Sequence, residues 1–305
     1  MSTRDGADAR AEVVREIREA NRFVLVTHEN PDGDALGSLV AMQHLLTALG
    51  KDSVMYVAPQ EFPLPYEYRF FHLDGLVSVD AQELSQRTIV FLDCGNIDRN
   101  PADALKREGA HILNIDHHHD NTHFGNVNLV VPEASCTAEI VWDLSRELGV
   151  VPSGPMADAL YVGLVTDTGR FMYENTSPRA HVMAAELVEA GVDVHGIYRR
   201  LYEGLPAERL ELLGRALTKM QRFDDGRLTL TSLTAEDYSA AGAEESYSEG
   251  VVDHLRSVDG TSVAALVRDV LADDRRGQRK VSLRAADGRV DVSLIAREQG
   301  GGGHQ

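Results

Sequence analysis

The segment His-Glu-Asn-Pro-Asp-Gly-Asp, residues 28–34, carries three side chains of the types that bind metal ions. His28, Asp32 and Asp34 follow a short apolar run, on a turn that also contains a proline and a glycine. Charged groups this close together lose solvation and repel one another, so a positive charge is expected among them. On a turn after a strand, alternate residues can direct two carboxylates toward two different ions.

Two further predicted strands end on aspartates. The apolar runs 88–93 and 110–116 end on Asp93 and Asp116. Strands that alternate with helices predict an α/β fold with a parallel sheet, and in such sheets ligands bind beyond the carboxyl ends of the strands. A single aspartate after a strand is usually a cap or a turn residue. Three strand ends that all carry ligand-type residues favour a binding site.

Histidines follow the last of these strands. His117 and His118 come directly after Asp116, and Asp167 ends a helix-like run. Carboxylates and imidazoles without a thiolate suit Mn(II), Mg(II) or Co(II) better than structural zinc. Two such ions about 4 Å apart would activate a water molecule and hold a phosphoryl group for in-line attack.

The composition limits the class of protein. The chain has 305 residues with 43% hydrophobic and 26% charged residues, which is typical of a soluble globular protein with room for two domains. Its formal charge of −18, most of it in residues 1–212, argues against wrapping long duplex nucleic acid. Only two cysteines, no membrane-length apolar run and no secretory pattern at the N-terminus predict a reduced, cytoplasmic setting without a membrane partner.

We expect two domains joined by a helical connector. Residues 1–186 alternate predicted strands and helices, 187–212 are predicted as the connector, and 213–305 resume as a smaller α/β domain. The first domain would hold the metal ions. The second domain is less acidic than the first.

Four motifs in this order resemble those of the DHH phosphoesterase superfamily. They are "HENPDGDALGS", "FLDCGN", "IDHHH" and "LVTDTGRF", and the terminal "GGGGH" resembles the signature of the DHH-associated C-terminal domain. Together they cover nearly the whole chain. The length and the second domain are most similar to the nanoRNase/pAp phosphatase (NrnA-type) subfamily.

The resemblance implies a role for each matching residue. Asp93 would bridge two Mn(II) ions, with Mg(II) or Co(II) as alternatives. His118 would contact the phosphate or act as general acid, and Asp116 would orient the histidine segment. The implied metal ligands are His28, Asp32 and Asp93 for one ion, and Asp34, Asp93, His117 and Asp167 for the other.

The resemblance also implies substrate contacts. Gly302 and Gly303 would let backbone N–H groups approach a phosphate, and His304 would contact it. Arg284 would act as a charge clamp in the same cleft. Arg170, close after Asp167, is a further candidate, with a surface role as the alternative.

The sequence departs from the family pattern at two places. Ala285 follows the arginine at a position where the family usually has a small polar residue, which weakens one expected contact. The family also continues past the glycine-histidine signature. The sequence therefore leaves open whether the second domain is truncated at Gln305.

These features predict a Mn(II)-dependent phosphoesterase that cleaves short oligoribonucleotides to mononucleotides and also acts on pAp. A phosphodiesterase for cyclic di-AMP or pApA is the alternative within the enzymes. A nucleotide sensor without turnover stays open as a different class, as does a structural α/β protein with acidic surface clusters. The resemblance suggests a homodimer.

Overall fold

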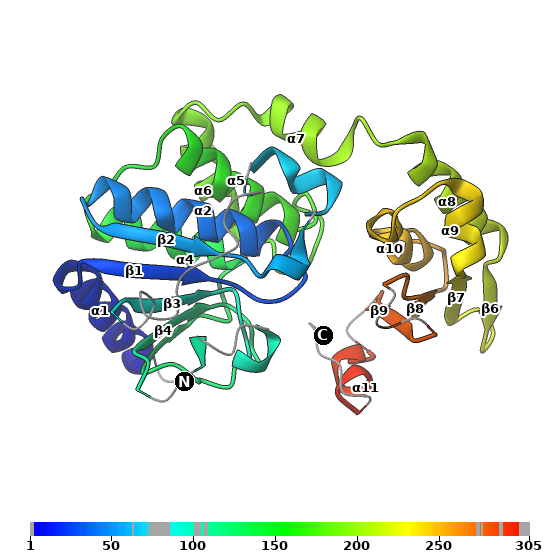
Figure 1. Ribbon diagram of the computed structural model, residues 1–305, viewed down its shortest axis with the longest axis horizontal. Coiled ribbons are helices and arrows are strands. Elements are labelled where there is room, and N and C mark those ends of the chain that lie inside the picture. Colours follow the sequence, from blue (N-terminus) through cyan, green and yellow to red (C-terminus); the bar gives the residue numbers. More distant parts are fainter. Residues whose placement is uncertain are drawn as a thin grey trace. The chain divides into compact units, whose positions relative to one another are not determined.

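The computed structural model describes most of the chain and divides it into two compact units. They span Met1–Leu201 and Tyr202–Gln305 (Figure 1). The boundary falls inside the predicted connector 187–212, and the three-part division of the chain stays a prediction. The described residues are 3–62, 64–71, 73, 86–100, 105–106, 109–272, 275, 277–286 and 289–298.

The first unit contains a five-stranded sheet in which all strands are parallel. The strand order is β2-β1-β3-β4-β5. Its central strands are almost fully buried, as expected for a parallel sheet that is covered by helices on its faces. The predicted α/β fold is confirmed. The strands are β1 (Arg22–Val26), β2 (Asp52–Tyr56), β3 (Thr88–Leu92), β4 (Ile112–Asp116) and β5 (Val127–Val130).

The edge strand β5 was not predicted. It has only four residues, and two of its neighbours in the preceding segment are a glycine and an asparagine, which are typical of a turn. Its pairing with β4 gives it an extended conformation that its own sequence indicates weakly.

The helices of the first unit include two that approach unusually closely. A Cβ atom at Gly37 would lie 2.5 Å from the carbonyl oxygen of Ala159, so α2 and α5 can pack side by side only because this residue is glycine. The helices are α1 (Thr3–Glu19), α2 (Gly33–Ala48), α4 (Thr137–Glu147), α5 (Pro155–Asp167), α6 (Pro178–Glu189) and α7 (Val194–Tyr202), with short 3₁₀ helices η1 (Pro59–Glu61), η2 (Tyr66–Phe71) and η3 (Ile97–Arg99).

The second unit contains a four-stranded mixed sheet in the order β6-β7-β8-β9. Only the central pair, β7 and β8, is parallel. A small apolar core lies between this sheet and its helices, with Tyr238 as the largest buried side chain. The elements are α8 (Ala207–Thr218), β6 (Gln221–Phe223), β7 (Leu228–Leu233), α9 (Ala235–Ala241), η5 (Glu245–Ser248), α10 (Val251–Arg256), β8 (Val263–Asp269), β9 (Arg279–Ala285) and α11 (Val292–Glu298).

Within the described part of the chain, no helix combines the length and the apolar character that crossing a membrane requires.

Candidate metal centre

Three neighbouring strands bring the predicted ligands to one edge of the parallel sheet. β1, β3 and β4 lie side by side and run in the same direction, so their carboxyl ends meet. His28 follows β1, Asp93 follows β3 directly, and Asp116 is the last residue of β4. The parallel register therefore converts three distant sequence positions into one cluster.

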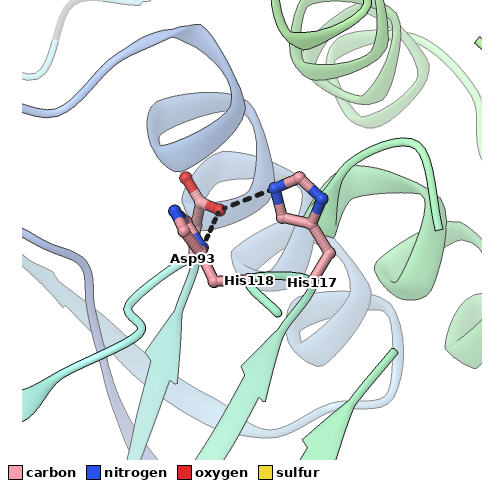
Figure 2. A group of neighbouring side chains, drawn as sticks. All are labelled: Asp93, His117 and His118. Carbon is pink, nitrogen blue, oxygen red and sulfur yellow. Dashed lines mark ion pairs between the residues drawn. The ribbon is translucent and has the colours of Figure 1, made fainter. Parts of the chain in front are cut away.

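Asp93 lies at the centre of this cluster. Its Oδ1 atom is 3.6 Å from both His117 Nε2 and His118 Nδ1 (Figure 2). Its Oδ2 atom is 3.6 Å from His28 Nε2. The backbone of Asp93 has φ +58°, a left-handed conformation that is uncommon outside glycine. The side chain is nearly fully buried. The strained turn thus places one carboxylate between three imidazole rings.

The orientation of His28 suits a metal ligand. Its Nδ1 atom lies 2.6 Å from the carbonyl oxygen of Glu29. Arg99 Nη2 lies 3.2 Å from the same Nδ1 atom. In the tautomer that donates from Nδ1 to the carbonyl oxygen, Nε2 carries the lone pair that a metal ion would need, 3.6 Å from Asp93 Oδ2. Metal-binding histidines are commonly fixed in this way by a carbonyl group.

Asp32 and Asp34 face different partners although only Gly33 separates them. Asp32 is exposed and caps α2, where its Oδ1 atom accepts hydrogen bonds from the N–H groups of Asp34 and Ala35 at 3.1 Å. Asp34 is buried, with 1% of its surface exposed. The turn therefore places the two carboxylates in different ligand groups, and their binding to two different ions stays a prediction.

A second cluster contains Asp34, His117 and Asp167. His117 Nε2 lies 3.6 Å from Asp167 Oδ2, at the end of α5. Gly163 of α5 makes room for this arrangement, because a Cβ atom there would lie 2.8 Å from Asp34 Oδ1. The close packing of α2 against α5 therefore brings the carboxylates of Asp34 and Asp167 to the imidazole ring of His117.

The buried carboxylates of the cluster have shifted pKa values, and added positive charge would stabilise their ionised forms. Burial, and then the neighbouring carboxylates, raise the pKa of Asp34 well above its ordinary value. Burial and the charge of Asp32 do the same to the pKa of Asp167. For Asp93, burial acts in the same direction, but the imidazole rings around it, first that of His28, outweigh it and hold the pKa well below the usual range.

Asp116 and His118 form an ion pair beside the cluster. His118 Nδ1 donates to Asp116 Oδ1 at 2.7 Å, and Asn121 donates to the other oxygen at 2.6 Å. Burial opposes protonation of His118, but the contact with Asp116 outweighs burial and raises the pKa of His118 to about 10. Burial likewise acts against ionisation of Asp116, yet His118 keeps its pKa below the ordinary value. His118 is therefore protonated at neutral pH.

The residues present fit divalent metal ions. The candidate ligands form three groups. Within each group, the donor atoms lie within 4.8 Å of one another. The donors are carboxylate oxygens and imidazole nitrogens, the set that suits Mn(II), Mg(II) or Co(II). All six predicted ligands belong to these groups, and their roles as ligands stay a prediction. The groups are His28, Asp32 and Asp93; Asp34, His117 and Asp167; and Asp93, His117 and His118.

The predicted substrate contacts are not members of these ligand groups, and three of them lie outside the described residues. Arg170 is exposed and follows Asp167 on a turn with φ +64°. Arg284 belongs to the second unit, on β9, where its Nε atom lies 4.0 Å from Asp253. The predicted residues Gly302, Gly303 and His304 lie outside the described residues.

Two residues of the cluster were missed by sequence reasoning. Thr137, the first residue of α4, donates from its backbone to Asp34 and from its hydroxyl to Asp93. Asn175 donates to Asp167 Oδ2 at 3.2 Å. The start of a helix at residue 137 was predicted, but the carboxylates that it meets come from other elements. The sequence pattern contains no signal for that contact.

The comparisons with known proteins agree with this geometry. The DHH family model for the N-terminal domain matches residues 22–164. The bifunctional oligoribonuclease and PAP phosphatase NrnA of Thermus thermophilus is 35% identical over 96% of this chain and 84% of its own length. The protein of the same name from Bacillus subtilis is 26% identical over 97% of this chain and 90% of its own.

A solved structure extends the agreement to the whole fold. An exopolyphosphatase-related protein from Bacteroides fragilis superposes with a TM-score of 0.82 and 26% identity, covering 98% of this chain and 89% of that protein. The fold and the site define an α/β protein with a carboxylate and imidazole centre at the strand ends. The chain belongs to the DHH family, and the resemblance predicted from its motifs is confirmed.

Proposed function

We propose that the chain is a Mn(II)-dependent phosphoesterase that hydrolyses short oligoribonucleotides to mononucleotides and removes the 3′-phosphate from pAp. Family membership confirms the enzyme class, a phosphoesterase. The observation that carries the proposal is the cluster of ligand groups beyond the ends of β1, β3 and β4, to which α2 and α5 add Asp34 and Asp167. The choice of substrates is supported by the names of the Thermus and Bacillus relatives, which state both activities.

Two Mn(II) ions are proposed for this centre. Asp93 would be a ligand of both ions, and its Oδ1 atom lies 3.6 Å from His117 Nε2. The other proposed ligands are His28 and Asp32 for one ion, and Asp34, His117 and Asp167 for the other. Two divalent ions supply a nucleophile from water at neutral pH and polarise the phosphoryl oxygens. Their charge would also offset the like charges that resist ionisation of the buried carboxylates.

His118 is the proposed group for the phosphate itself. Its Nδ1–H is donated to Asp116, which fixes the ring and keeps it protonated. The remaining N–H, on Nε2, can donate to a phosphate oxygen or give its proton to the leaving oxygen of the ester. Asp116 acts through His118 and is a positioning residue in this proposal.

The proposed substrates are short. A formal charge of −18 repels long nucleic acids, whose binding depends on many cationic contacts. Arg170 and Arg284, both exposed, are proposed contacts for a phosphate or a terminal nucleotide. Contacts from Gly302, Gly303 and His304, the homodimer and the cytoplasmic location remain proposals on the same footing.

The test is product release from pAp and from 5′-labelled RNA of graded length, with Mn(II) and with EDTA. We expect Mn(II)-dependent conversion of the shortest RNAs to mononucleotides and of pAp to AMP, both lost in Asp93→Ala. Cleavage confined to pApA or cyclic di-AMP would move the function to the alternative phosphodiesterase. Nucleotide binding without turnover would contradict the proposal and favour a sensor.

A further inference from the structure

One residue at the start of α4 contacts a carboxylate of each ligand group. The backbone N–H of Thr137 donates to Asp34 Oδ2 at 2.6 Å, and its hydroxyl donates to Asp93 Oδ1 at 3.0 Å. The next N–H, that of Ala138, donates to Asp34 Oδ1 at 2.9 Å. Thr137 is completely buried. A single helical turn therefore fixes two carboxylates from different elements.

The backbone contacts follow from the chemistry of a helix start. The first N–H groups of a helix lack partners within the helix and need an acceptor. Cys136, the N-cap residue of α4, makes no side-chain cap hydrogen bond. Asp34, from α2, supplies the acceptor in its place. The positive end of the helix dipole also favours the ionised form of this carboxylate, against the effect of burial.

The hydroxyl contact acts on the other carboxylate. An ionised carboxylate only accepts hydrogen bonds, so the Thr137 hydroxyl is the donor to Asp93. The donated proton occupies one lone pair of Oδ1 and fixes the rotation of the carboxylate among the three imidazole rings. Oδ1 keeps its second lone pair, and Oδ2 remains directed toward His28.

We infer that Thr137 is a positioning residue of the metal centre. Its hydroxyl orients the carboxylate of Asp93, which belongs to two of the ligand groups, and its backbone anchors the carboxylate of Asp34 in the third group. This inference rests on the proposed metal-dependent function and assigns a role outside the four motifs. Groups that orient metal ligands typically contribute about 10- to 100-fold to metal affinity or activity.

The experiment separates the hydroxyl from the backbone contact. Thr137→Val keeps the shape and the N–H group but removes the hydroxyl, whereas Thr137→Ser keeps both donors. The matched control is Thr231→Val, because Thr231 is a buried threonine of the second unit whose hydroxyl donates to the Ala216 carbonyl oxygen. Metal-free protein is titrated with Mn(II), and free Mn(II) is followed by electron paramagnetic resonance.

The expected result is an affinity loss confined to one variant. Thr137→Val should bind Mn(II) about 10- to 100-fold more weakly, with a lower kcat at limiting Mn(II) and an unchanged KM. Thr137→Ser should stay within a few-fold of the wild type. Thr231→Val should lose stability without losing Mn(II) affinity. If Thr137→Val does not fold, as judged by circular dichroism, Thr137→Ala is compared with Thr137→Ser instead. Weaker Mn(II) binding by Thr137→Ala would then support the role of the hydroxyl.

The failures are distinguishable. A wild-type protein that binds no Mn(II) would overturn the metal-centre proposal and this inference together. A wild type that binds Mn(II), with equal affinity in the hydroxyl-free variants of Thr137, would overturn this inference alone. An equal loss of Mn(II) affinity in Thr231→Val would also overturn this inference alone, because the loss would then follow from lower stability and not from the Thr137 hydroxyl.

Discussion

The two units of the chain treat buried charge in opposite ways. In the second unit, the buried charged side chains that the structure describes are Arg268 and Asp237, and each is paired with an opposite charge. Arg268 Nη2 lies 2.7 Å from Glu249, and Lys219 Nζ lies 2.5 Å from Asp237. In the first unit, several carboxylates converge on a few imidazole rings at one edge of the sheet.

The pKa shifts of carboxyl groups differ between the two units. Arg268 lowers the pKa of Glu249 against the effect of burial, so the charged form is favoured. Burial and neighbouring carboxylates raise the pKa of Asp34 and of Asp167, so their charged forms are disfavoured. In the described part of the second unit, each buried charge therefore has an opposite charge beside it. In the first unit, the raised pKa values of Asp34 and Asp167 mean that additional positive charge would favour their ionised forms, which fits the proposed metal centre.

The largest expected effect is that of removing the shared carboxylate. Asp93→Ala should lower phosphoesterase activity by more than about 100-fold, beyond the usual loss for a group that only orients a ligand. Metal content, measured by atomic emission, should fall in parallel. Asp237→Ala removes a buried aspartate from the second unit. This variant should keep both the phosphoesterase activity and the metal content of the wild type. Equal metal content in Asp93→Ala and wild type would remove Asp93 from the centre.

Metal removal should act on one unit. A ligand at 100 times its Kd stabilises the folded state by about 2.7 kcal/mol per site. We expect Mn(II) to slow amide hydrogen exchange in α4 and at the ends of β3 and β4, and EDTA to reverse this change. Exchange in β7 and β8 should be unaffected. Equal protection of both units would contradict a centre confined to the first unit.

Two glycine-to-alanine substitutions should change the free energy of unfolding in opposite directions. A Cβ atom at Gly163 would lie 2.7 Å from Ala138 Cβ and 2.8 Å from Asp34 Oδ1, so Gly163→Ala should destabilise by about 1–3 kcal/mol. It should also weaken Mn(II) binding. A Cβ atom at Gly214, an exposed position of α8, meets nothing within 4 Å, so Gly214→Ala should stabilise by about 0.8–1.0 kcal/mol. Denaturant unfolding of both variants, with Mn(II) titration, measures the contrast.

The smallest expected effect concerns acid stability of the second unit. The folded-state pKa of Glu249 lies below its unfolded value of 4.5, so the ion pair with Arg268 stabilises the fold above that pH. This contribution is lost as the pH falls through the folded pKa. Because Glu249 is half-exposed, it amounts to about 1 kcal/mol or less. In Glu249→Gln the stability difference from wild type should shrink on acidification, while Mn(II) affinity at neutral pH stays unchanged.

Much of the candidate site was predictable because its residues lie at strand ends. His28, Asp93 and Asp116 each terminate a short apolar run, and a parallel sheet necessarily brings such ends together. The α/β fold followed from the alternation of strands and helices, and it is confirmed. The edge strand β5 was not predicted, because a four-residue strand depends on its pairing partner more than on its own residues.

The sequence by itself determined which residues are the candidate ligands, because ligand type and strand position are both local properties. Only the tertiary structure decided how the carboxylates are held. Thr137 and Asp34 are separated by 103 positions, and their hydrogen bond exists because α2 and α4 pack against the same sheet. Periodicity and spacing report local conformation. A contact between distant helices depends on side-chain volume, such as the missing Cβ at Gly163, and on the path of the chain.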